Sequence, residues 1–78
     1  MADAVLLRRG LLVGTSVYAE VGAMGPLTVE ALTAALPERY APITVQRIEG
    51  ELVAWKGHWA VVRLAVPVPG IEMEIACW

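Results

Sequence analysis

The stretch ITVQRIEGELVAWKGHWAVVRLAVPVPGIEMEIACW, residues 43–78, decides the fold. Val, Ile, Leu and Trp dominate it, and two short segments interrupt it, KG at residues 56–57 and PVPG at residues 67–70. Apolar, β-branched runs separated by short segments with Gly or Pro are typical of strands joined by hairpin turns. The stretch therefore predicts an antiparallel meander of three strands.

The pattern also predicts how these strands are paired. We expect a type I turn at residues 54–57, with Gly57 in the left-handed conformation, and a four-residue loop at residues 67–70. Each turn, assigned separately, brings the apolar residues of neighbouring strands onto the same side of the sheet. This predicted core face consists of Ile48, Gly50, Leu52, Ala60, Val62, Leu64, Val66, Ile71, Met73, Ile75 and Cys77.

The opposite face of the meander carries charged residues and one group of large apolar side chains. The predicted register lines up Glu49, Arg63 and Glu74 as a row of alternating charge. Apolar patches beside such charges are typical of contact surfaces. The alternative is that the N-terminal part of the chain covers the apolar group within one molecule. We expect an interaction surface formed by Val53, Trp59, Val61 and Trp78.

The N-terminal half of the chain supplies a further strand and a helix. Residues 11–21 alternate between apolar and polar or small side chains, which is typical of a strand. After a Gly-containing break, residues 28–36 have Thr28 as the expected N-cap of a helix that ends before Pro37. The apolar stripe that should pack on the core face consists of Val29, Leu32 and Leu36.

Residues 3–9 are compatible with two structures. Asp3 as a cap and Gly10 after the last turn would suit a short helix. However, Val5, Leu6 and Leu7 are apolar without helical spacing, which favours a strand in a hairpin with residues 11–13. The sequence as a whole predicts one α+β domain over residues 1–78. Its two layers are one helix and a mostly antiparallel sheet of four to five strands, which ends in the three-stranded meander.

Composition limits the classes of function. A chain of 78 residues buries only about 60% of its unfolded surface, yet 58% of these residues are hydrophobic. The excess apolar surface predicts self-association into a homodimer or a higher oligomer. A net charge of −2, with dispersed basic residues, is unlike a nucleic-acid-binding protein, and no apolar run is long enough to span a membrane. The single cysteine, Cys77, excludes an internal disulfide framework and indicates a cytoplasmic protein.

The sequence offers little for catalysis or for cofactor binding. One His and one Cys fall short of the roughly four ligands that zinc takes, and no nucleophile motif surrounds Ser16. We therefore expect no catalytic residue, no metal site and no cofactor.

Two functions of different classes follow. The first is a non-enzymatic interaction or oligomerisation module that binds a second copy, or another protein, through the aromatic patch. The second is a small-molecule or weakly catalytic site at a subunit interface, in a groove formed by Tyr18, Trp55 and His58.

Overall fold

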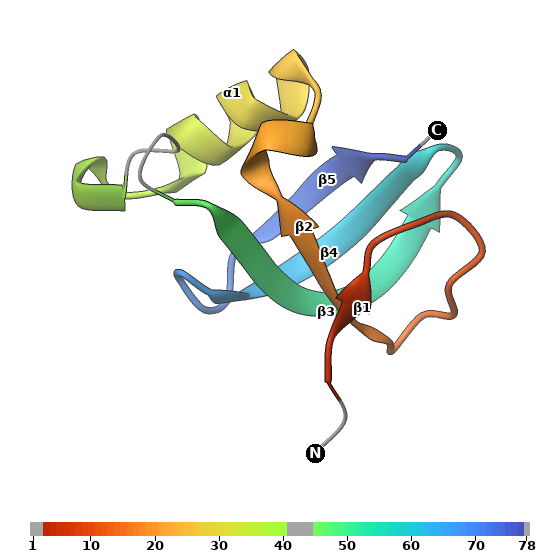
Figure 1. Cartoon of the computed structure of the whole chain (residues 1–78). Coiled ribbons are helices and arrows are strands. Elements are labelled where there is room, and N and C mark those ends of the chain that lie inside the picture. The colour runs from red at the N-terminus through yellow and green to blue at the C-terminus, as the bar shows by residue number, and fades with distance from the viewer. Residues whose placement is uncertain (1–2, 41–44, 78) are drawn as a thin grey trace.

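A computed structural model describes residues 3–40 and 45–77 (Figure 1). In chain order its elements are β1 (Val5–Leu6), β2 (Ser16–Glu20), the 3-10 helix η1 (Val21–Ala23), α1 (Pro26–Ala35), the 3-10 helix η2 (Glu38–Tyr40), β3 (Arg47–Lys56), β4 (Trp59–Val66) and β5 (Glu72–Ala76). The five strands form one sheet in the order β1-β2-β3-β4-β5. The predicted fold class is confirmed: one helix packs on a mostly antiparallel sheet that ends in a three-stranded meander.

The core lies between the sheet and α1, which packs across one end of the sheet and contacts β5 (Figure 1). Successive side chains of a strand point to opposite sides of the sheet, and the apolar residues recur at every second position. They therefore gather on the face that α1 covers. The core cluster consists of Val17, Ala19, Leu32, Leu36, Val45, Ile48, Leu52, Ala60, Val62, Leu64, Met73, Ile75 and Cys77. Most of the predicted core face of the meander is therefore confirmed.

The register of the meander differs from the prediction by two residues. The first turn is Gly57 and His58, because β3 continues to Lys56 and β4 begins at Trp59. Gly57, the first residue of this two-residue turn, has a φ of 61°, a conformation that favours glycine. Next to this turn the register is displaced by three residues, and Ala54 pairs with Val61 instead of His58. Beyond Val53, which has no partner in β4, the displacement is two residues, so Leu52 pairs with Val62 instead of Ala60. Since the side-chain period of a strand is two, a displacement of two residues leaves each side chain on its predicted face.

The charge row on the outer face is also displaced. Arg63 pairs with Glu51 and Glu72, and not with Glu49 and Glu74 as predicted. At the C-terminal end of β4, the pairing with β3 is irregular, and the register shifts by one residue between Glu49 and Gly50. The ribbon of β3 is bent along its length (Figure 1). Val66 consequently lies opposite Glu49 and is 49% exposed, so its predicted place in the core is wrong.

A second shift lies between Leu52 and Ala54, where Val53 is the extra residue of a β-bulge. The bulge reverses the alternation of side chains in the last part of β3. Trp55 therefore lies opposite Ala60 and packs partly buried against the core.

The N-terminal strands depart most from the predicted topology. Residues 5–6 form a strand, but this strand pairs in parallel with β2, with Val5 opposite Val17. The predicted hairpin with residues 11–13 is wrong because that segment forms a loop, which Gly10 and Gly14 allow through positive φ angles of 90° and 98°. The predicted strand over residues 11–21 is correspondingly shorter, Ser16–Glu20.

The helix begins earlier than predicted. Gly25 is the N-cap residue, and Pro26 occupies the first helical position, where its missing N–H costs no hydrogen bond. Thr28 is therefore not the cap but lies inside the first turn, buried against the core. Its neighbours at the same helical spacing, Leu32 and Leu36, are buried as predicted. Among the described residues, no helix is long and apolar enough to cross a bilayer.

Candidate interaction surfaces

Trp59 is the member of the predicted aromatic patch that keeps exposed surface next to other apolar groups. It begins β4, its side chain is half-buried, and it lines the same depression as the N-terminal turn of α1. Together they line a depression of about 210 Å³, whose other lining residues are Gly25, Pro26, Leu27, Thr28 and Ala76. Leu27 is 67% exposed, so the depression is bordered by an uncovered leucine. This combination of Trp59 and Leu27 is an open apolar surface.

Leu27 was missed by the sequence interpretation. With Thr28 as the expected cap, the preceding leucine had no assigned direction. The N-cap is Gly25, three positions earlier than expected, so Leu27 lies within the first turn of α1, where its side chain is exposed. The Gly-Pro pair at residues 25–26 was the signal that could have placed the helix start correctly.

The other members of the predicted patch lie in different environments. Val61 is only 9% exposed and lies between Ala54 and Glu74 on the neighbouring strands. Val53 is half-buried at the bulge of β3. Trp78 lies outside the described residues. Val61 is thus covered within one molecule, and an interaction surface on this part of the protein depends on Trp59.

The three residues of the predicted ligand groove are separated within one molecule. Tyr18 lies opposite Glu49, six residues along β3 from Trp55, which corresponds to about 20 Å of strand. Arg47 covers the ring of Tyr18, with its guanidinium carbon 3.8 Å from the ring centroid. His58 is exposed in the β3–β4 turn. A groove that uses all three side chains would require two copies of the chain, and it stays a prediction.

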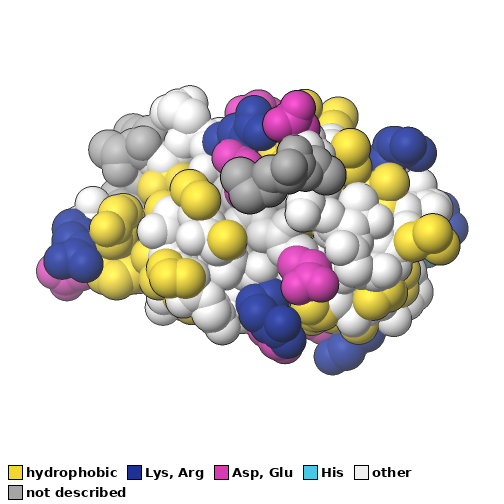
Figure 2. Space-filling view, turned by 90° about the horizontal axis from the view of Figure 1, so that it is seen from below, with side chains coloured by type: hydrophobic (Ala, Val, Ile, Leu, Met, Phe, Trp, Pro, Cys, Tyr) yellow, Lys and Arg dark blue, Asp and Glu magenta, His cyan; other side chains and the backbone are white. Residues whose placement is uncertain are grey.

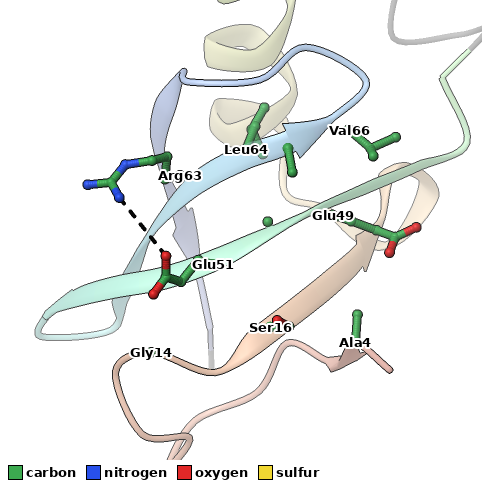
Figure 3. Close-up of a pocket in the computed structure, with 10 residues that line it drawn as sticks. Ala4, Gly14, Ser16, Glu49, Glu51, Arg63, Leu64 and Val66 are labelled. Carbon is green, nitrogen blue, oxygen red and sulfur yellow. Dashed lines mark ion pairs between the residues drawn. The ribbon is translucent and has the colours of Figure 1, made fainter. Parts of the chain in front are cut away.

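A shallow pocket of about 500 Å³, whose lining includes Gly50, opens on the outer face of the sheet (Figure 3). Glu51 and Arg63 point toward one another at its edge, with 4.0 Å between the carboxylate and the guanidinium (Figure 3). The same guanidinium donates to Glu72 through Nε at 3.2 Å and through a terminal nitrogen at 3.0 Å. These side chains are about half-exposed, and exposed ion pairs of this kind contribute little stability. The charges at this pocket are therefore matched by one another.

Most of the large exposed hydrophobic side chains lie near the N-terminus. Four of them belong to β1 and the loop after it, and the set within residues 3–40 and 45–77 is Val5, Leu6, Leu12, Val13, Leu27 and Val66. Seen from below, the hydrophobic side chains are divided by charged and polar groups and form no single continuous patch on this face (Figure 2). Apolar surface is therefore offered at several distinct places.

The edge strands β1 and β5 border a common groove of about 280 Å³. Its walls are mostly apolar and consist of Leu6, Leu7, Arg8, Ala19, Glu20, Ala23, Met24, Ile75, Ala76 and Cys77. Burial raises the pKa of the Cys77 thiol, and the nearby positive charge of Arg9 partly opposes this. The sequence interpretation missed the groove because the expected hairpin placed β1 elsewhere.

The part of the chain that the structure describes contains no cluster of three or more His, Cys, Asp and Glu side chains that could hold a metal ion. No family model matches the chain, and no match was found among curated proteins or among solved structures. Function therefore has to be inferred from the surfaces described above.

Proposed function

We propose that this chain is a protein-interaction domain that associates with a second copy of itself through the open apolar surface around Trp59 and Leu27. The observation that carries the proposal is the depression between α1 and the β4–β5 pair, where a half-buried tryptophan borders a leucine that is 67% exposed. Tryptophan in such a position is enriched at the energetic centres of protein interfaces. A location in the cytoplasm is part of the proposal and is supported by the single cysteine.

The surface has the features that self-association requires. Three separate elements build it, α1, β4 and β5, so its shape depends on the folded domain. The lining of the depression carries no charged residue, so a second copy meets no buried charge there. The high hydrophobic content of a short chain gives a general reason for association, because a small fold cannot cover all of its apolar side chains.

Sedimentation equilibrium of the wild-type chain and two aspartate variants tests the proposal. We expect a wild-type dimer or higher oligomer at micromolar concentration, and a monomer for Trp59→Asp, since a carboxylate in the contact must be desolvated. Val66→Asp is the matched control. Val66 is also an exposed hydrophobic residue of β4, but it lies seven positions away, about 23 Å along the strand.

Circular dichroism must show that both variants keep the fold. A wild-type monomer, or a Trp59→Asp variant with the mass of the wild-type oligomer, would exclude this surface as the contact. A loss of association in Val66→Asp alone would move the contact to the other end of β4.

A further inference from the structure

The groove between β1 and β5 is bordered by two edges of the same sheet. These strands are the first and the last in the strand order, so each has one neighbour in the sheet. Sheet edges present backbone N–H and C=O groups that can pair with an additional strand. A groove that has such an edge on each side is suited to an extended peptide.

The hydrogen bonds of β1 show which of its groups point into the groove. Leu6 lies opposite Tyr18 in the parallel pair, and the amide of the next residue, Leu7, donates to the Tyr18 carbonyl at 2.8 Å. In a parallel pair, only every second residue of a strand forms backbone hydrogen bonds with the partner strand, and the residues between them point away from it. The N–H and C=O of Leu6 therefore point away from β2, and its side chain is 52% exposed.

The hydrogen bonds of β5 likewise show which of its backbone groups point into the groove. The amide of Cys77 donates to the His58 carbonyl at 2.7 Å, so the backbone of Cys77 is directed toward the β4 side. In an antiparallel pair, the N–H and C=O groups of successive residues point alternately toward the partner strand and away from it. The backbone groups of Ala76 therefore point away from β4, and Ala76 lines the groove.

The charges at the groove select the kind of peptide. Arg8 lines the groove, and Arg9 lies close enough to Cys77 to affect its pKa. Within the described residues, the ion pairs engage Arg47, Lys56 and Arg63, and neither Arg8 nor Arg9 takes part in one. The lining contributes one acid, Glu20. With Arg9 nearby, the groove therefore has an excess of positive charge beside its apolar walls.

We propose that this groove binds an extended segment of another protein in which apolar and acidic side chains alternate. The segment adds as a strand beside β1, with its apolar side chains toward Leu7 and Ile75 and its carboxylates toward Arg8 and Arg9. Alternation is required because successive side chains of a strand point to opposite sides. A second copy of this chain is a poorer occupant, since its exposed apolar loop carries the same two arginines and like charges would meet.

Titration of the isotope-labelled Trp59→Asp variant with two peptides tests the proposal, because this variant removes the surface of the proposed function and leaves the groove. The probes are acetyl-IEVEI-amide and acetyl-IKVKI-amide, which share length and alternation and differ in charge. We expect the glutamate peptide to shift the amide signals of Leu6 and Leu7, which line the groove and do not line the depression beside Trp59. We also expect Arg8→Glu to weaken its binding about tenfold and to favour the lysine peptide.

The proposal is overturned if neither peptide shifts these signals at millimolar concentration, or if both bind equally well. It is also overturned if the same signals move with protein concentration alone, because a second copy then occupies the groove. Self-association through Trp59 is measured on the wild-type chain without peptide, so the two proposals fail separately.

Discussion

The indole Nε1 of Trp55 donates a hydrogen bond of 2.9 Å to the carbonyl oxygen of Leu11, 44 positions earlier in the chain. This bond ties the loop between β1 and β2 to the end of β3, where the Thr15 and Leu52 backbones are also bonded at 3.0 Å. Trp55 and Trp59, only four positions apart, therefore have different roles. Trp55 holds the loop inside one molecule, and Trp59 borders an open surface.

The Trp55→Phe variant should loosen the loop without emptying the core. Phenylalanine keeps most of the apolar contact but has no donor for the Leu11 carbonyl. We expect a loss of about 1 kcal/mol in the free energy of unfolding. Amide hydrogen exchange in residues 10–15 should become faster, while exchange in β4 stays close to the wild-type rate. Trp59→Phe is the control, and an equal effect on the loop in that variant would contradict the assigned role.

Gly50 should be intolerant of any side chain. A Cβ added there would fall on the carbonyl oxygen of Arg63, which belongs to the neighbouring strand and has no room to move. We expect Gly50→Ala to lower the free energy of unfolding by about 2 kcal/mol or more, as overpacked sites do. Gly22→Ala is the matched control, because a Cβ at Gly22 meets nothing within 4 Å. Urea unfolding of the two variants measures the difference, and equal midpoints would refute it.

Two leucines of α1 differ in burial, and their substitution tests how the helix packs on the sheet. Leu32 is fully buried, whereas Leu27 is 67% exposed on the same helix. We expect Leu32→Ala to cost about 3 kcal/mol, the usual result of removing a buried leucine side chain, and Leu27→Ala to change the unfolding free energy of the monomer by less than about 0.5 kcal/mol. Both should be measured in the Trp59→Asp background, so that association does not contribute. A comparable cost at the two positions would show that α1 is packed differently.

Cys77 should make stability depend on pH in the alkaline range. Burial raises the pKa of its thiol above the ordinary value of 9.0, so the folded chain disfavours the thiolate. The contribution to stability is complete below the ordinary value and is lost as the pH rises through the folded-state pKa. We expect the stability of the wild-type chain, relative to Cys77→Ala, to fall above about pH 9.

A second variant tests the cause of that shift. Arg9 lowers the pKa of Cys77, so Arg9→Gln should raise it further and should slow alkylation of the thiol by iodoacetamide at a given pH. An alkylation rate that does not change in Arg9→Gln would mean that Arg9 has no electrostatic influence on the thiol.

Several features of the fold were predictable from local sequence. The alternation of apolar residues in 48–64 and 71–77 assigned the core face correctly although the register was displaced, because a shift of two residues returns each side chain to its side. The helix was predictable from its apolar spacing, although its start at Pro26 was not. The bulge at Val53 was not predictable, because it depends on how β3 bends over the core. Beyond the bulge, the side chains of β3 lie on the opposite face from the expected one.

By itself, the sequence determined most of the core face, because the periods of helix and strand convert a pattern of apolar residues directly into a face. Only the tertiary structure decided how the N-terminal strand β1 is paired. Backbone N–H and C=O groups are the same in every residue except proline, so nothing in Val5–Leu6 specifies a parallel pair with β2 in place of a hairpin. That pairing brings β1 to the groove opposite β5, and the helix start brings Leu27 to Trp59. The candidate surfaces therefore arise from contacts between distant segments, which no local pattern records.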